Sequence, residues 1–124
     1  MKLLLVDDDA FLRDMYALKF SETGHEVDAV DSGMAALAKL EQTQDFDLII
    51  TDVIMPGMNG VELLQAISDK YPNIKAKRIV LSNQGQDEDI REATEAGAVG
   101  YIIKAESIPS DVVKKVEAIA AKFI

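Results

Sequence analysis

The chain of 124 residues contains no cysteine, no tryptophan, only three prolines and a single histidine. The lack of cysteine excludes disulfide bonds, thiol catalysis and thiolate metal sites. Long apolar runs are also missing. The run that follows Met1 stops at Asp7, which is too soon for a secretory signal or a membrane span. These absences predict a soluble cytoplasmic protein without a membrane segment.

Basic residues are scarce as well. The chain has 13 lysines and arginines against 22 acidic residues, which gives a formal net charge of −9 and a pI near 4.5. Direct binding to nucleic acid needs a basic surface, so this balance argues against it. The balance suits basic protein partners and divalent cations. Hydrophobic residues make up 48% of the chain, and the length suits one domain over residues 1–124.

Apolar runs alternate with helical patterns along the whole chain. Strands are predicted at residues 3–6, 26–30, 47–51, 78–82 and 100–103, each followed by a helix. The expected inward-facing residues are Phe11, Leu12, Met15 and Leu18 in the first helix, Met34, Ala35, Leu37, Ala38 and Leu40 in the second, and Leu63, Leu64 and Ile67 in the third. The expected helix caps are Asp9, Asp31 or Ser32, and Asp87, and the expected stops are Gly24, Pro72 and Gly97. Pro109 suits the first turn of the last helix.

This alternation predicts an α/β fold of the (βα)5 type. The five parallel strands would form a doubly wound, flavodoxin-like sheet of order 2-1-3-4-5, with right-handed crossovers. No linker, internal repeat or low-complexity segment interrupts the pattern.

Charged and polar residues gather at the carboxyl ends of the predicted strands. Asp7 and Asp8 follow the first strand, Asp52 the third, Ser82 ends the fourth, and Lys104 follows the fifth. Ligands of open α/β sheets bind at this edge, where the first and third strands are neighbours. Like charges a few ångströms apart repel by about 4 kcal/mol at an effective dielectric of ~20. The pocket must therefore take up a proton, bind a cation or keep a compensating lysine.

The chemistry of these groups points to phosphoryl transfer. Oxygen ligands favour a hard cation, and a site with few protein ligands suits Mg²⁺ better than Ca²⁺. Lys104 supplies a second positive charge. A carboxylate such as Asp52, beside Mg²⁺, an ammonium group and a hydroxyl, is arranged to accept a phosphoryl group as the nucleophile.

Four features in this order carry a family resemblance. They are the pair Asp7-Asp8, the segment Asp52-Val53-Ile54-Met55-Pro56-Gly57-Met58-Asn59-Gly60, Ser82, and Gly100-Tyr101-Ile102-Ile103-Lys104. Over essentially its full length the chain resembles the receiver domain of two-component response regulators, especially the single-domain, chemotaxis-regulator-like kind. The resemblance implies a phosphorylation-switched signalling module. It would be no enzyme beyond self-catalysed phosphoryl acceptance and slow autodephosphorylation.

The resemblance also implies roles for individual residues. Asp52 would take a phosphoryl group from a phosphohistidine on a histidine kinase or histidine phosphotransfer protein. Asp8, Asp52 and the backbone carbonyl of Ile54 would bind Mg²⁺ directly, with Asp7 acting through a water. The resemblance further assigns Ser82 and Lys104 to the phosphoryl oxygens and Tyr101 to an inward-swinging switch. The face made by the fourth helix, fifth strand and fifth helix would then change its affinity for a downstream protein target or output domain.

Two positions depart from the family pattern, Asn83, where a small residue often follows the strand-4 hydroxyl, and Ala105. Ala105 replaces the proline that usually follows the strand-5 lysine through a cis peptide bond. A cis bond before a non-proline residue costs about 3 kcal/mol. We therefore expect a relaxed trans bond, which would shift the start of the last helix and the fine position of Lys104.

Other interpretations of these residues remain open at this stage. A Mg²⁺-dependent phosphatase with an aspartyl-phosphate intermediate would use Asp7 and Asp9, but would leave Asp52 unexplained. A flavodoxin-like cofactor binder lacks its glycine-rich phosphate loop. His25 is expected at the surface, and the methionines at 15 and 34 in the core. Met55 and Met58 would support the loop after Asp52. The chain suits both a stand-alone regulator and a receiver cut from a longer one.

Overall fold

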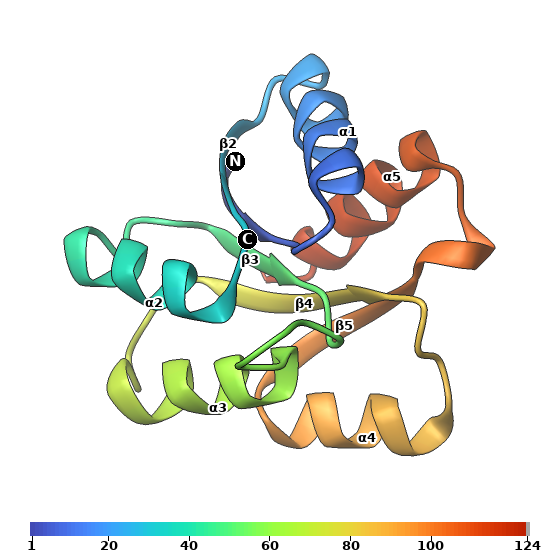
Figure 1. Ribbon diagram of the computed structural model, residues 1–124. Coiled ribbons are helices and arrows are strands. Elements are labelled where there is room, and N and C mark those ends of the chain that lie inside the picture. The colour runs from blue at the N-terminus through green and yellow to red at the C-terminus, as the bar shows by residue number, and fades with distance from the viewer. Residues whose placement is uncertain (124) are drawn as a thin grey trace.

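The computed structural model describes residues 1–123 and contains one parallel five-stranded sheet of order β2-β1-β3-β4-β5 (Figure 1). This order confirms the predicted doubly wound, flavodoxin-like topology. Ile124, the last residue of the predicted domain, lies outside the described residues. The strands are β1 (Lys2–Val6), β2 (Glu26–Val30), β3 (Leu48–Thr51), β4 (Lys77–Ser82) and β5 (Ala98–Ile103). The helices are α1 (Ala10–Glu22), α2 (Gly33–Gln42), α3 (Gly60–Lys70), α4 (Asp87–Glu95) and α5 (Pro109–Ala120), with a 3-10 turn η1 (Lys104–Glu106).

Helices cover both faces of the sheet. Figure 1 shows α1 and α5 on one side and α2, α3 and α4 on the other. Alternate residues of β1 point to opposite faces, so Leu3 and Leu5 pack towards α1 and α5 while Leu4 and Val6 pack towards α2 and α3. A strand in the middle of such a sheet is covered on both faces and is therefore apolar at nearly every position. The prediction of strands from short apolar runs is confirmed for this reason.

Most helix boundaries follow the capping residues. The carboxylate of Asp9 accepts from the Leu12 amide at 3.1 Å, and the hydroxyl of Ser32 accepts from the Ala35 amide at 3.0 Å. Gly24 and Gly97 have positive φ of 88° and 114°, which only glycine adopts without strain, and they end α1 and α4 as predicted.

The predicted cap of α4 was wrong by one residue. Gln86 is the N-cap and Asp87 is already helical. The Gln86 amide donates to the carboxylate of Asp89 at 3.1 Å. Because an acid at this third helical position can serve the cap amide, Asp87 is free to begin the helix.

The inward faces of two helices also differ from the prediction. Phe11 and Leu18 of α1 are 76% and 58% exposed, and Tyr16 and Phe20 are buried in their place. Leu12 and Met15 are partly buried, as expected. The apolar residues of α1 form two overlapping stripes, and packing against the sheet and α5 selects the stripe with the larger aromatic side chains.

In α2, Met34 is 65% exposed instead of lying in the core, and the buried residues are Gly33, Ala36 and Leu40. A Cβ on Gly33 would lie 2.9 Å from the sulfur of Met58. Because Gly33 faces the protein, the next residue of the helix points about 100° away from it, into solvent. Met55 and Met58 pack against the core below β3, as predicted.

His25 was wrongly predicted to be a surface residue. Only 9% of its side chain is exposed. Its Nε2 lies 2.9 Å from the Glu117 carboxylate, its Nδ1 lies 3.0 Å from the Met1 amine, and its ring meets Phe20 edge-on. The ring is covered because it lies against Phe20 of α1 and Glu117 of α5. No helix within residues 1–123 is long and apolar enough to cross a membrane.

Candidate functional site

The topology of the sheet brings the predicted site residues to one edge. Val6 and Thr51 are paired in the parallel ladder of β1 and β3. Asp7 and Asp52 therefore leave the sheet side by side, at the switch point where the chain winds in opposite directions. Ser82 ends β4, and Lys104 follows β5 directly. The predicted convergence of strand 1 and strand 3 acids is confirmed.

Three carboxylates form the centre of this site. One oxygen from each of Asp7, Asp8 and Asp52 can be chosen so that all lie within 4.8 Å of one another. Their environments differ, because Asp7 is 2% exposed, Asp8 is exposed, and the side chain of Asp52 is 13% exposed. This group could hold a metal ion, and its all-oxygen donors fit a hard divalent cation.

Lys104 bridges two of the three acids. Its Nζ donates to Asp7 Oδ2 and to Asp52 Oδ2, each at 2.8 Å, and only 6% of its side chain is exposed. Burial alone would lower the pKa of Lys104, but hydrogen bonds to Asp52 and Asp7 outweigh burial and raise it. The lysine is therefore a fixed ammonium ion that offsets part of the crowded negative charge.

The backbone holds Asp52 tightly. Its amide donates to the carbonyl of Val6 at 3.1 Å, and its Oδ1 accepts from the Val53 amide at 2.7 Å. The loop then returns against the strand end, since the Gly60 amide donates to the Val53 carbonyl at 2.8 Å. A Cβ at Gly60 would lie 2.0 Å from the Asp52 carbonyl oxygen, so only glycine permits this approach.

Ser82 and Tyr101 meet at one loop residue. Ser82 is buried, and its hydroxyl accepts from the Gln84 amide at 3.2 Å. The hydroxyl of Tyr101 donates to the carbonyl of the same residue. Burial raises the pKa of Tyr101, with a smaller contribution from the charge of Asp89. Two predicted site residues are thus linked through the β4–α4 loop.

The remaining predicted positions lie near this edge. Ile54 is two residues beyond Asp52, in the loop after β3, and the residue is 61% exposed. A role for its backbone carbonyl stays a prediction. Residues 1–123 contain no cis peptide bond, so Lys104 and Ala105 are joined in trans, as expected. The turn η1 follows directly, and α5 begins at Pro109.

Sequence reasoning missed two neighbours of the site. Arg13 Nη1 donates to the carbonyl of Asp7 at 3.0 Å, across the start of α1. Tyr16 is 3% exposed, and burial raises its pKa while the nearby charge of Lys104 lowers it. Arg13 lies one helical turn after the cap residue Asp9, and this spacing could have indicated that its side chain lies near the site. Nothing in the local sequence around Tyr16 indicated its position.

The carboxylate of Asp9 is not part of the acid group, although the Asp9 amide donates to Asp7 Oδ1 at 3.0 Å. The Asp9 carboxylate caps α1 through the Leu12 amide. The phosphatase interpretation pairs Asp9 with Asp7 as the nucleophile, but Asp7 is buried against Lys104. A nucleophile must be reached by an external substrate, and the 2% exposure of Asp7 does not suit that role.

Known proteins with the same pattern are numerous. The family described as "Response regulator receiver domain" matches residues 3–117. The chain is 40% identical over 103 residues to response regulator protein FleR of Pseudomonas aeruginosa, covering 83% of this chain and 21% of FleR. It is 36% identical over 104 residues to chemotaxis protein CheY of Thermotoga maritima, covering 83% of this chain and 84% of that protein.

Solved structures agree with the sequence relatives. The structure of chemotaxis protein CheY4 of Vibrio cholerae superimposes with a TM-score of 0.85 at 31% identity, covering 95% of this chain and 97% of that one. The relatives include single-domain proteins and also regulators such as FleR, of which this chain spans about a fifth. On its sequence match, its fold and its acidic site, the chain belongs to the receiver-domain family of two-component response regulators, which are signalling modules rather than enzymes.

Proposed function

We propose that Asp52 is the phosphoacceptor of this receiver domain. The observation that carries the proposal is the double hydrogen bond of Lys104 to Asp7 and Asp52. Asp52 is the partly exposed member of that pair, while Asp7 is buried. In the transfer, the P–N bond of a phosphohistidine breaks as a P–O bond to the Asp52 carboxylate forms. The donor is a histidine kinase or a histidine phosphotransfer protein.

The neighbouring side chains have distinct roles in this proposal. Lys104 neutralises negative charge on the incoming phosphoryl oxygens, because its ammonium already lies 2.8 Å from the accepting carboxylate. The hydroxyl of Ser82 donates a hydrogen bond to a phosphoryl oxygen. A movement of Ser82 disturbs its hydrogen bond with the Gln84 amide, and Tyr101 responds because it binds the carbonyl of Gln84. The face formed by α4, β5 and α5 changes its affinity for a downstream target as a result.

Mg²⁺ is the cofactor that suits this site. Asp8, Asp52 and the carbonyl of Ile54 would hold it directly and Asp7 through a water, since a small hard cation keeps several waters. When bound, the cation supplies positive charge opposite the phosphoryl oxygens. The protein contributes the clustered oxygens of Asp7, Asp8 and Asp52. The target is either a separate protein or an output domain, because relatives of both kinds are similar to this chain.

Phosphoryl labelling tests the assignment of Asp52. The wild type and Asp52→Asn are treated with acetyl phosphate and Mg²⁺, and their intact masses are measured. We expect one phosphoryl group on the wild type and none on the variant. Asp45→Asn, which removes an exposed acid distant in the fold, is the matched control and should be labelled normally. A labelled Asp52→Asn protein, or catalytic turnover of a simple phosphomonoester by the wild type, would contradict the proposal.

A further inference from the structure

The α-amine of Met1 is held in place at the opposite end of β1 from the acid group. Figure 1 marks this end of the chain beside β2, and Lys2 pairs with Glu26 in the parallel ladder. The Met1 carbonyl accepts from the Glu26 amide at 2.9 Å, and the Met1 side chain packs against the core that α1 and α5 cover. The fold therefore fixes the position of the amine.

The amine is the first of three polar groups in a row. It lies 3.0 Å from His25 Nδ1, and His25 Nε2 lies 2.9 Å from the Glu117 carboxylate. The side chain of His25 is 9% exposed, and that of Glu117 is 42% exposed. The contact between the amine and Nδ1 holds one proton between two nitrogen lone pairs. Two nitrogen donors therefore point at the same position.

The separation of these nitrogens matches the ligand spacing of a transition metal. Metal–nitrogen bonds are about 2.0–2.1 Å long, so two nitrogens at right angles on one ion lie about 2.9 Å apart. Tetrahedral ligands would lie about 3.4 Å apart. The observed 3.0 Å is close to the right-angled value. Square-planar sites of nitrogen and oxygen ligands select Cu²⁺ or Ni²⁺, and Cu²⁺ binds more tightly.

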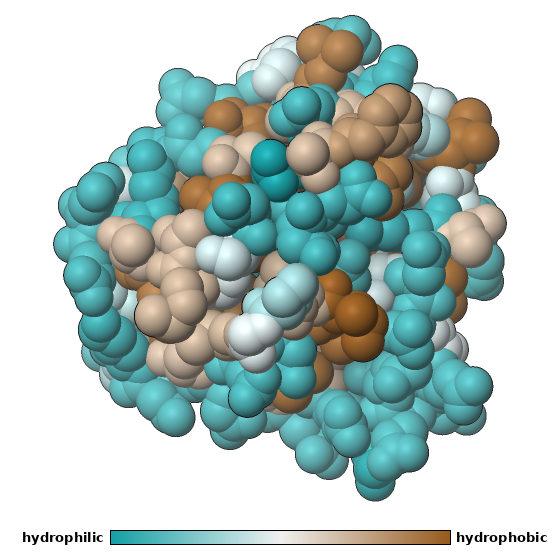
Figure 2. All heavy atoms as spheres, in the orientation of Figure 1, coloured by the Kyte–Doolittle hydropathy of each residue, from teal (hydrophilic) through white to brown (hydrophobic). Residues whose placement is uncertain are grey.

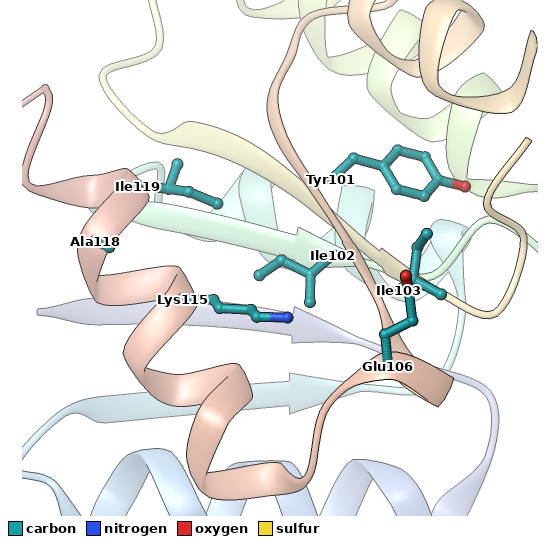
Figure 3. Close-up of a pocket in the computed structure, with 7 residues that line it drawn as sticks. All are labelled: Tyr101, Ile102, Ile103, Glu106, Lys115, Ala118 and Ile119. Carbon is teal, nitrogen blue, oxygen red and sulfur yellow. The ribbon is translucent and has the colours of Figure 1, made fainter. Parts of the chain in front are cut away.

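Glu117 stands behind His25 as a carboxylate stands behind a metal-binding histidine. Such a histidine usually donates its second N–H to a carboxylate, which fixes the ring. Figure 3 shows Lys115 and Ile119 of α5 facing the groove beside β5. Glu117 is two residues from each and therefore points about 200° away from them, towards His25. Its carboxylate is thus available to orient the imidazole.

The backbone next to the amine is already occupied. At an unfolded chain end, Cu²⁺ binds the amine together with the neighbouring backbone amide nitrogens. In the folded chain the Lys2 amide donates to Asp47 Oδ2 at 2.8 Å, so it does not serve as a ligand. His25 Nδ1 is the nitrogen that the fold presents to the amine.

Surface carboxylates offer a different kind of ligand. Figure 2 shows an almost wholly hydrophilic surface over α4, a helix with five acids and one arginine. Carboxylate oxygens suit Mg²⁺ and Ca²⁺, whereas imidazole nitrogen suits Cu²⁺, Ni²⁺ and Zn²⁺. Excess Mg²⁺ therefore competes for the oxygen groups and leaves the nitrogen pair free.

We propose that the Met1 α-amine and His25 Nδ1 bind a divalent transition-metal ion of the Cu²⁺ type, with Glu117 orienting the imidazole. The ion takes the place of the proton between the two nitrogens, so one proton leaves to solvent for each ion bound. Water fills the other coordination positions. This site goes beyond phosphoryl acceptance and is independent of it, because it uses none of the residues of the acid group.

Titration with Cu²⁺ alone tests the site. The chain that begins at Met1 is titrated in a weakly buffered, non-coordinating solution that contains excess Mg²⁺. Electron paramagnetic resonance records the ligands, and a pH-stat records the released protons. We expect one tightly bound Cu²⁺ per chain, two nitrogen ligands and one released proton. These readouts report coordination itself, which a purely structural contact would not produce.

Variants assign each ligand. His25→Ala should lose the site, and so should a chain with glycine and proline added before Met1. Proline has no amide N–H, so the new chain end does not chelate Cu²⁺ through its backbone. Glu117→Gln should weaken Cu²⁺ binding roughly tenfold, as changes behind a ligating histidine do. The control Glu88→Gln/Glu92→Gln removes two exposed acids of α4 and should leave the affinity unchanged.

Two-nitrogen binding that persists in the extended chain would overturn the proposal. A spectrum with oxygen ligands alone, or equal weakening by Glu117→Gln and by the α4 pair, would also overturn it. If His25→Ala does not fold, the extended chain decides, because it keeps His25 with its contacts to Glu117 and Phe20.

Discussion

Lys104 is the residue on which the charge balance of the site depends. Its buried ammonium contacts Asp7 and Asp52, and Asp7 has almost no exposure to water. Ions that leave water lose several kcal/mol of solvation free energy, so such a group is stable only as a hydrogen-bonded set. The lysine offsets part of the repulsion among the three acids at this edge of the sheet.

Replacing this lysine should therefore be costly. Lys104→Met leaves the buried carboxylate of Asp7 without its partner, and removal of one member of a buried pair costs about 3–5 kcal/mol. Urea unfolding at pH 7 measures the loss. Lys75→Met is the control, because Lys75 pairs with Asp45 on the exposed surface and should matter little. A Lys104→Met protein as stable as the wild type would show that the pairing contributes nothing.

The raised pKa of Lys104 predicts that the free energy of unfolding depends on pH. Because the folded state raises the pKa of Lys104, its contribution is fully present below the unfolded pKa of about 10.4 and is lost as pH rises through the folded pKa. Burial raises the pKa of Tyr16 and Tyr101 and acts in the same direction. The free energy of unfolding should therefore fall above about pH 10, and less steeply in Lys104→Met. An equal slope in both proteins would contradict this assignment.

Replacing either of two glycines near the site by alanine should lower stability, but by very different amounts. A Cβ at Gly60 would collide with the Asp52 carbonyl, which the strand holds in place, whereas one at Gly85 would meet the flexible end of Ile103. We expect Gly60→Ala to cost roughly 3 kcal/mol or more and to reduce labelling of Asp52, and Gly85→Ala to cost about 1 kcal/mol. Chemical denaturation of both variants checks this, and equal losses would be inconsistent with the close approach at Gly60.

At the scale of elements, one histidine connects three segments of the chain. His25 lies between α1 and β2, and its ring reaches Glu117 of α5 and packs against Phe20 of α1. Elements at the two ends of the sequence are thereby joined across the same face of the sheet. This link lies at the opposite end of β2 from the acid group, because Glu26 begins the strand and Val30 ends it.

Removing that connection should affect stability and leave the chemistry intact. His25→Ala loses the hydrogen-bond contacts to Glu117 and to the Met1 amine and an aromatic contact with Phe20, and we expect a loss of about 1–2 kcal/mol in thermal or urea unfolding. Glu117→Gln should lose less, because an amide can still accept the hydrogen bond. Phosphoryl labelling of His25→Ala should match that of the wild type, and a loss of labelling would show that the link reaches the site.

For the molecule as a whole, the high negative charge predicts stabilisation by divalent cations. At a Mg²⁺ concentration near 100 times its Kd, mass action adds about 2.7 kcal/mol, a rise in Tm of roughly 10 °C for a chain of this size. Calorimetry with and without chelator, against NaCl of equal ionic strength, measures the rise. Asp8→Asn should largely remove it, while Glu22→Gln, which removes an exposed acid of α1, should keep it. An equal rise in Asp8→Asn would indicate general screening in place of a site.

The alternation of strands with helices and the position of the acids at the strand ends were both predictable from the sequence. Local periodicity is enough to predict the short apolar strands, and parallel strands share one carboxyl edge. These two rules place the strand-end residues Asp7, Asp52, Ser82 and Lys104 together. Those patterns join residues that are close along the chain. Predictions from those patterns therefore do not require knowledge of how distant segments pack together.

Tertiary structure alone decided the rest. Lys104 and Asp7 are 97 positions apart, and the shared strand edge predicted that they lie near each other, but only packing decided that Lys104 bonds to Asp7 as well as to Asp52. His25 and Glu117 are 92 positions apart, and no local pattern indicated that they touch. Packing against the sheet and α5 determined which face of α1 is buried. Tyr16 and Phe20 lie in that core, while Phe11 and Leu18 are exposed. Local sequence sets where strands and helices form and which groups end them. Which side chains become buried or paired is set by packing between elements far apart in sequence, because burial is a property of the surrounding molecule.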